Sequence, residues 1–182
     1  MNDADLAGLS LLLAPSDVVA EFLALSVVES TFTPGMTIKI ELDGARGRIV
    51  DTGRGMNPFP DPGDTMSHVQ RALTSVYPIV PENLQVLEVL TDLVWGSRGS
   101  LGPSVANNAC VEFRFTSYRQ GVEWTQVYRY GVPDGPAIRV GATGRGGTML
   151  RFETLGEIDV SAVTELVRNL RTRIPSIAIT GP

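Results

Sequence analysis

The sequence predicts an α+β fold, a two-layer sandwich in which helices cover one face of a mixed, mostly antiparallel sheet. Three observations support this class. A helical pattern of apolar residues near the N-terminus is followed at once by the alternation typical of a strand. The pair Asp43-Gly44 separates two alternating runs, as in a β-hairpin. Beyond residue 109, short alternating runs recur before a final helical pattern. Several antiparallel strands beside several helices make such a sandwich.

The first helix is expected over about residues 17–30. Ser16 is a suitable N-cap, and apolar residues such as Val18, Phe22 and Leu25 follow at spacings of three and four. The segment 33–35, Thr-Pro-Gly, ends the pattern.

The next elements form a predicted hairpin. Residues 37–42 place Ile38, Ile40 and Leu42 on one face, which indicates a strand. After the turn at 43–44, residues 46–50 return as the second strand. This strand brings Asp51 to its end.

The middle of the chain is expected to hold two helices between loops. Three prolines within residues 57–63 exclude regular structure there. An amphipathic pattern runs from Met66 to Val76, and Pro81 at a first helical position begins another helix through about Val94. The glycine- and serine-rich segment 96–104 is predicted to be a flexible loop.

The C-terminal half is predicted to supply most of the sheet. Strands are expected over 111–115, 122–130, 136–140 and 148–153, with a turn at Gln120-Gly121. Asp159 caps a last helix, and residues 176–179 form a closing strand. No internal boundary indicates a second domain. His68 is expected on the surface, and Cys110 is expected as a small buried hydrophobe.

Composition excludes several classes of protein. With 182 residues and 43% hydrophobic content, the chain suits one domain with a sizeable core. A formal charge of -5 disfavours direct nucleic-acid binding. The single cysteine excludes an internal disulfide, and no Cys/His spacing suggests zinc. No apolar run approaches the roughly 20 residues that span a bilayer. We therefore expect a cytoplasmic protein without membrane contact.

The stretch IVDTGRGMNP, residues 49–58, raises the first functional question. It places Asp51 at a strand end, followed by Gly53 and Gly55. By itself this pattern suits a tight turn as well as a nucleotide pocket, since both need glycine.

Two further stretches add to this motif. They are GSRGSLGPSVANNA at 96–109, and YRYGVPDGPAIRV at 128–140 followed by GGTMLRF at 146–152. In this order the three resemble the Bergerat-fold, or GHKL, ATPases, and look most similar to the ATPase domain of DNA gyrase B and its topoisomerase IV counterpart, the type IIA topoisomerases. The resemblance spans roughly residues 16–179. It implies an N-terminal arm over 1–15 and a single GHKL ATPase-like domain over 16–182, with no transducer or DNA-cleavage domain. Such a chain is not a complete topoisomerase by itself.

The resemblance implies specific roles around an adenine ring. Asp51 would accept a hydrogen bond from the adenine amino group. Gly53 and Gly55 would let the backbone lie close to the base, Met56 would form an apolar wall, and Arg54 would cover the base by stacking.

Other positions would serve the rest of ATP or ADP. Thr148 would support Asp51 through its hydroxyl or a bridging water. The stretch 96–109 resembles the family's lid segment. Its glycines Gly99 and Gly102 would present backbone N–H groups to the phosphates. The implied cofactors are ATP or ADP together with Mg²⁺.

The hydrolytic part of the motif departs from the family. Members have a glutamate that activates water and, four residues later, an asparagine that holds Mg²⁺. An ungapped alignment from Asp51 places Phe22 and Ser26 there, whereas a one-residue slip gives Glu21 and Leu25. Glu21 is thus the candidate catalytic base, the alternative being a solvated helix carboxylate. Ser26 is the candidate Mg²⁺ ligand through its hydroxyl.

A second departure lies in the lid. Relatives tend to have a Gly-Leu-His-Gly run where this chain has Ser97-Arg98-Gly99-Ser100. Arg98 would supply part of the missing histidine's charge, or is an exposed loop arginine.

Three functions therefore stay open. The first is a gyrase-B-like adenine-nucleotide-binding domain with weak or lost ATP hydrolysis. The second is a nucleotide-free pseudo-ATPase that acts as a protein-interaction or gyrase-regulatory module. The third is the active ATPase of a type II topoisomerase-like system. The partners that these functions imply are adenine nucleotide and a gyrase or topoisomerase subunit or another protein.

Overall fold

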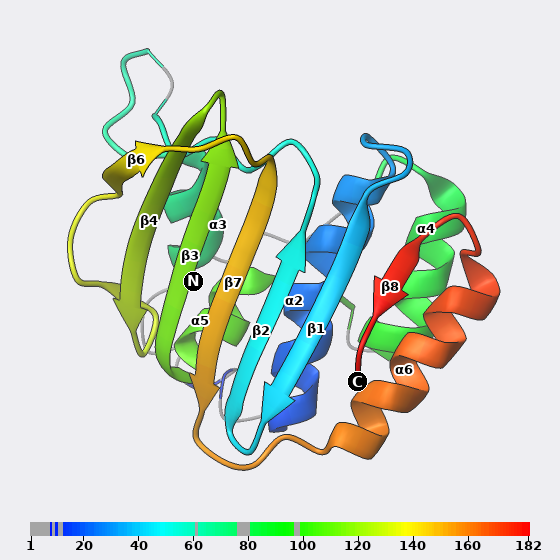
Figure 1. The fold of residues 1–182 in the computed structure, drawn as a ribbon. Helices are drawn as coiled ribbons and strands as arrows, with labels where there is room; N and C mark the ends of the chain where they lie inside the picture. The colour runs from blue at the N-terminus through cyan, green and yellow to red at the C-terminus, as the bar shows by residue number, and fades with distance from the viewer. Residues whose placement is uncertain (1–7, 9, 11–12, 61, 76–80, 97–98) are drawn as a thin grey trace.

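An eight-stranded sheet forms one layer of the molecule (Figure 1). The computed structural model describes residues 8, 10, 13–60, 62–75, 81–96 and 99–182. Its strand order is β5-β4-β3-β7-β2-β1-β8, with β6 also paired to β4. Only the β1–β8 pair is parallel in the described sheet. The strands are β1 (Thr37–Asp43), β2 (Arg46–Asp51), β3 (Cys110–Arg119), β4 (Val122–Arg129), β5 (Val132–Pro133), β6 (Ile138–Ala142), β7 (Gly147–Thr154) and β8 (Ala178–Thr180).

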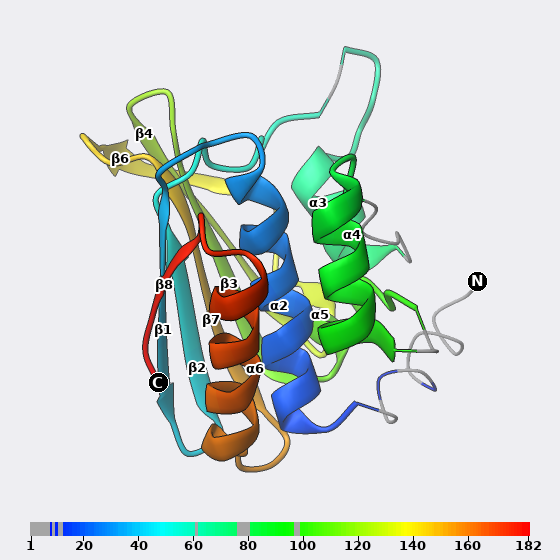
Figure 2. The same ribbon diagram turned by 90° about the vertical axis from the view of Figure 1, so that its right-hand side faces the viewer.

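The helices all lie on one face of this sheet, as the side view in Figure 2 shows. They are α2 (Pro15–Ser30), α3 (His68–Thr74), α4 (Leu84–Leu90), the π-helical turn η1 (Thr91–Trp95), α5 (Pro103–Asn108) and α6 (Val160–Arg173). The predicted α+β sandwich with a mixed, mostly antiparallel sheet is therefore confirmed. No helix in the described part of the chain has the length and hydropathy of a transmembrane segment.

Helix α2 is the centre of the core because it is enclosed by the sheet on one side and by other helices around it. Phe22 stacks on Phe113 of β3 at a centroid distance of 4.7 Å and lies 5.2 Å from Phe152 of β7. In β1, Ile38 and Ile40 alternate with exposed residues and face this helix. The period-two pattern of the strands thus directs one set of side chains to the core and leaves the other face open to solvent.

The hairpin of β1 and β2 positions the predicted site. Ile38 pairs with Asp51, and Val50 pairs with Met149 of β7, so Asp51 ends a strand inside the sheet beside the start of β7. The Asp51 side chain has the parity of Ile49 and therefore points to the helix-covered face.

Most predicted elements are present, with two corrections. The helix expected from Pro81 begins instead at Leu84, because the Asn83 side chain accepts hydrogen bonds from the N–H groups of Gln85 and Val86 and caps it there. The expected loop 96–104 ends early, since α5 already begins at Pro103. Residues 76–80, 97–98 and most of the predicted arm 1–15 lie outside the described residues.

Candidate functional site

Three hydrogen bonds hold the Asp51 carboxylate, which is 4% exposed. Oδ1 accepts from the backbone N–H groups of Gly53 and Thr148, each at 3.0 Å, and Oδ2 accepts from the Ser26 hydroxyl at 3.0 Å. A carboxylate offers about four acceptor positions, two on each oxygen. The described residues occupy three of these positions, which leaves one acceptor position on Oδ2 for a ligand.

Burial is the largest influence on the pKa of Asp51 and raises it above its ordinary value. The three hydrogen bonds act in the opposite direction but do not outweigh burial, and the negative charge of Glu29 adds to the rise. The carboxylate is thus held in an environment that disfavours its charge, as is common for functional groups. A donor from a ligand would stabilise the ionised form.

A cavity of ≈ 190 Å³ adjoins this carboxylate. Its polar lining includes Asp51, Ser26, Glu29 and Thr148. Its apolar lining consists of Leu25, Val28, Met56 and Leu150. A buried acceptor beside apolar walls can take a flat ring that carries an N–H group on its rim.

The two glycines after Asp51 are required by the protein's own packing. A Cβ on Gly53 would lie 2.5 Å from Cγ of Glu29. A Cβ on Gly55, whose φ is +75°, would lie 2.7 Å from the carbonyl oxygen of Tyr118. A side chain at either position would therefore collide with a neighbour, and at Gly55 the backbone conformation also favours glycine. Residues 51–56 thus form a tight turn, and Asp51 and Met56 at its two ends also line the cavity.

Arg54 is held by Glu29, which lines the cavity. Its Nε and Nη2 donate to Oε1 and Oε2 of Glu29, both at 2.9 Å, and its backbone N–H donates to Oε1 at 2.8 Å. The guanidinium lies 4.6 Å from the ring centroid of Phe32. Arg54 thus stacks on the chain's own aromatic ring beside the cavity.

The same contacts set the charge of Glu29. Burial alone would raise the pKa of Glu29, but the hydrogen bonds from Arg54 and from the Thr33 hydroxyl together outweigh burial, so the pKa lies below its usual value. Glu29 stays ionised and keeps Arg54 in place.

The hydrogen bond from Thr148 to Asp51 is donated by the backbone N–H of Thr148, not by its hydroxyl. The neighbouring Gly147 has φ +110°, and a Cβ there would lie within 3 Å of the Asp51 main chain, which is closer than any side chain tolerates. The Gly-Thr pair therefore lets the start of β7 approach Asp51 closely enough for the Thr148 N–H to donate.

The residues do not form a Mg²⁺ site around Ser26. The Ser26 hydroxyl is 2% exposed and donates to Asp51, and its neighbour Leu25 has no ligand atom. No group of three or more His, Cys, Asp or Glu side chains in the described residues is placed to hold a metal ion. The arrangement assigns Ser26 to the support of the carboxylate.

Glu21 is buried, so its interpretation as a solvated helix carboxylate is wrong. Its Oε1 accepts from the backbone N–H of Leu101 at 3.4 Å, because the segment before α5 packs against α2. Phe22 faces the sheet and belongs to the core. The structure therefore favours the alignment with a one-residue slip. In that alignment Glu21 stands at the family's glutamate position and Leu25 stands at its asparagine position, one helical turn later.

The lid glycines lie near α5. Gly99 has φ +69° and Gly102 has φ +84°, and Gly102 directly precedes the first residue of α5. Arg98 lies outside the described residues.

Sequence reasoning missed two groups of this site. Glu29 had a signal, since Glu21, Leu25 and Glu29 follow at intervals of four and share one side of a helix. Arg119 had none: its Nη1 donates to the carbonyl oxygen of Gly55 at 2.6 Å, a contact between segments 64 residues apart.

Comparison with known proteins finds similarity in sequence and in fold. No protein-family profile matches the sequence. Over 144 residues the chain is 30% identical to the B subunit of DNA topoisomerase 4 from Caulobacter vibrioides, in a region that is 76% of this chain and 20% of that protein. The chain therefore spans about a fifth of the length of this curated relative.

The fold has a solved counterpart. It matches the topoisomerase IV ATP-binding domain of Francisella tularensis, solved in complex with a small-molecule inhibitor, with a TM-score of 0.73 and 20% sequence identity over 91% of this chain and 79% of that chain. The chain is therefore similar in sequence to part of a topoisomerase IV B subunit and has the fold of a topoisomerase IV ATP-binding domain.

Proposed function

We propose that the chain is an adenine-nucleotide-binding domain of the gyrase-B type whose ATP hydrolysis is weak or lost. The observation that carries the proposal is the Asp51 carboxylate, which keeps one acceptor position on Oδ2 and borders an apolar cavity. The exocyclic amino group of adenine would donate there, with Met56 and Leu150 against the faces of the ring. That both related proteins are topoisomerase IV chains, one of them an ATP-binding domain, supports the same ligand.

The phosphates would extend from the cavity toward the lid segment. Gly99 and Gly102 are our candidates for backbone contacts to them. Arg54 would stand at the cavity mouth, fixed by Glu29. We assign no step to Mg²⁺, since the side chains near Ser26 do not fit it.

Weak hydrolysis follows from the residues on α2. Glu21 would have to receive a proton from water, yet it is buried beneath the segment that leads into α5. Leu25 stands where the family's metal-binding asparagine would stand in the same alignment. Loss of a positioned base alone costs about 10²–10⁴-fold in rate. We therefore expect nucleotide binding with turnover near the background rate.

A thermal-shift titration with ADP and ATP, each with and without Mg²⁺, tests this proposal. Ligand at 100 times its dissociation constant adds about 2.7 kcal/mol of stability. We expect both nucleotides to raise the melting temperature, with little effect of Mg²⁺. The absence of any shift at millimolar nucleotide, confirmed by calorimetry, would refute the proposal.

A nucleotide-free interaction module is the second candidate. The observation that favours it is the size of the cavity, ≈ 190 Å³, against about 300–1,000 Å³ for pockets that hold drug-sized ligands. A pull-down with gyrase and topoisomerase IV subunits, at saturating nucleotide and without nucleotide, separates the two. Capture that is equal in both conditions, together with no nucleotide binding by calorimetry, would favour the module.

A further inference from the structure

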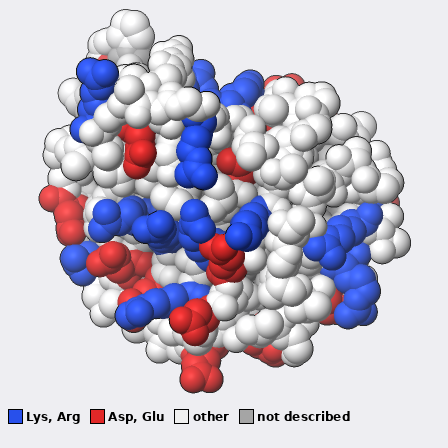
Figure 3. Space-filling model, viewed as in Figure 1, with Lys and Arg blue, Asp and Glu red and all other residues white. Residues whose placement is uncertain are grey.

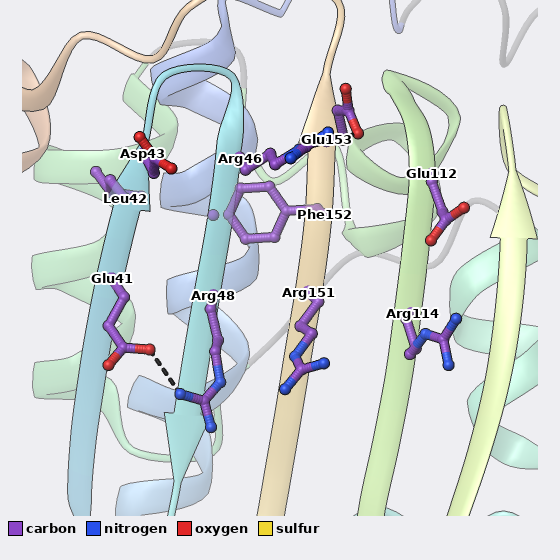
Figure 4. A pocket seen from close by; sticks show the side chains of 11 residues that line it. Glu41, Leu42, Asp43, Arg46, Arg48, Glu112, Arg114, Arg151, Phe152 and Glu153 are labelled. Atoms are coloured by element: carbon purple, nitrogen blue, oxygen red, sulfur yellow. Dashed lines mark hydrogen bonds and ion pairs between the residues drawn. The ribbon is translucent and has the colours of Figure 1, made fainter.

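The open face of the sheet, opposite the helices, carries a row of three arginines on adjacent strands. Arg48 of β2 pairs with Arg151 of β7, and Arg151 pairs in turn with Arg114 of β3. Residues opposite one another on neighbouring strands point to the same face of a sheet. Figure 4 shows the three side chains next to one another, and Figure 3 shows a basic band across this face. We call these three residues the arginine row.

The arginine row lines a hollow of ≈ 720 Å³ on this face. Strands in a sheet are about 4.8 Å apart, so the row spans roughly 10 Å. Carboxylates border it. Glu41 of β1 lies opposite Arg48, Glu112 lies two residues from Arg114 on β3, and Glu153 lies two residues from Arg151 on β7. The hollow is therefore a short cationic strip with acidic borders.

The bordering carboxylates are engaged with other cations. Glu153 pairs with Arg46 at 3.3 Å, and Glu112 pairs with Arg129 at 3.2 Å. These two acids therefore do not neutralise the row.

Among the described residues, Arg48 of this row has an acidic partner, Glu41 at 2.6 Å. Arg114 and Arg151 are exposed, and neither guanidinium group makes an ion pair or hydrogen bond with a described residue. Like charges directly opposite on neighbouring strands destabilise a sheet. The protein thus holds two uncompensated guanidinium groups next to each other and beside a third.

We propose that the arginine row binds a compact, multiply charged anion that bears phosphate groups. Guanidinium groups match phosphate oxygens in a bidentate fork, and two or three of them on a 10 Å strip (a span of about two strand spacings) suit a di- or triphosphate moiety. The bound anion removes the repulsion between Arg114 and Arg151. This site lies on the face opposite Asp51 and is independent of the adenine cavity.

The borders decide between a small anion and a macromolecule. A nucleic-acid strand or an acidic protein segment that ran along the row would meet Glu41 at one end. One that ran at right angles to the row, parallel to the strands, would meet Glu112 and Glu153. The net charge of -5 further disfavours a long polyanion. A small phosphate compound fits between these carboxylates.

Calorimetric titration of the 182-residue chain with inorganic pyrophosphate, at constant ionic strength set with NaCl, tests the site. We expect binding with a stoichiometry near one, and a dissociation constant at least tenfold higher for the double variant Arg114→Gln/Arg151→Gln. The control is Arg168→Gln, which removes one positive charge from an ion pair with Glu165 on α6 and leaves binding unchanged. The variant Arg114→Lys/Arg151→Lys keeps the charge but loses the fork, and falls between the two.

Circular dichroism and thermal melting establish that each variant folds. Without anion, the double glutamine variant melts at the same temperature as the wild-type chain or higher, because the repulsion is gone. The proposal is overturned if pyrophosphate does not bind the wild-type chain, or if Arg168→Gln weakens its binding as much as the double glutamine variant does. It is also overturned if a short DNA oligonucleotide or poly-glutamate binds the row more tightly than pyrophosphate.

Discussion

Replacing Asp51 by asparagine separates ligand recognition from stability. Asparagine keeps the shape of the side chain and one carbonyl oxygen, which still accepts from the N–H groups of Gly53 and Thr148. Its amide nitrogen takes the place of Oδ2 and donates to the Ser26 hydroxyl, which rotates to accept. The position that we assign to the adenine amino group then faces a donor instead of an acceptor.

The size of the effect follows from the bond that is lost. A hydrogen bond to a charged acceptor contributes about 1.5–3 kcal/mol, which corresponds to roughly 10- to 150-fold in the dissociation constant. Two facing donors add to this loss. We therefore expect the affinity of Asp51→Asn for ADP to fall at least tenfold.

The same substitution is expected to lower ligand affinity but not the stability of the folded chain. Because the pKa of Asp51 is raised in the folded protein, stability is lost as the pH rises from the unfolded pKa through the folded one, and at neutral pH the ionised carboxylate is a cost. Asp51→Asn removes that cost. The variant should melt at the same temperature as the wild-type chain or higher at pH 7, and the difference should shrink as the pH falls below the raised pKa.

Calorimetry with ADP and urea denaturation at several pH values measure both effects. Asp159→Asn is the matched control, because Asp159 caps α6 far from the cavity and asparagine caps helices equally well. Unchanged ADP affinity in Asp51→Asn would refute the recognition argument. Destabilisation that is largest at neutral pH would refute the argument from burial.

Three further predictions concern the surroundings of the carboxylate. Gly55→Ala should destabilise the chain by more than about 1 kcal/mol in urea denaturation, because its Cβ would meet a backbone oxygen at 2.7 Å. Gly63→Ala, which has a similar φ of +88° and open space, should cost less, and an equal loss would contradict the packing argument. Glu29→Gln should cost up to about 1 kcal/mol at pH 7, since Arg54 is more than half exposed. Because the pKa of Glu29 is lowered in the folded chain, its contribution to stability is present above the unfolded pKa and is lost as the pH falls through the folded pKa. If Glu29→Gln destabilised the chain equally at roughly pH 3, this account would be wrong. Glu21→Gln should leave phosphate release from ATP near background, whereas a wild-type rate that this variant lowers 100-fold would show an active enzyme.

Local sequence patterns predicted the parts of the site that lie within one segment. Alternation and the turn at 43–44 predicted the hairpin, and with it the strand end that carries Asp51. Gly53 and Gly55 follow directly, and each is constrained by contacts that exclude a Cβ. Turn chemistry and strand periodicity are short-range effects, so a single sequence reveals them.

Packing between distant segments determined what the sequence did not show. The bond from Ser26 to Asp51 joins residues 25 positions apart, and it depends on the rotation of α2 against the sheet. That rotation is fixed by Phe22, which stacks on Phe113 and turns Glu21 toward Leu101. Unless the rotation of α2 about its axis is known, the position of Glu21 next to Phe22 is equally compatible with an exposed and with a buried carboxylate.

The comparison of ADP with IDP, by calorimetry on the wild-type chain, tests most directly whether Asp51 recognises a purine amino group. The two nucleotides share their sugar and phosphates, but hypoxanthine has a carbonyl oxygen where adenine has the amino group. A buried acceptor rejects an acceptor, so we predict that ADP binds at least tenfold more tightly than IDP. Equal affinities would show that the carboxylate does not contact the purine edge.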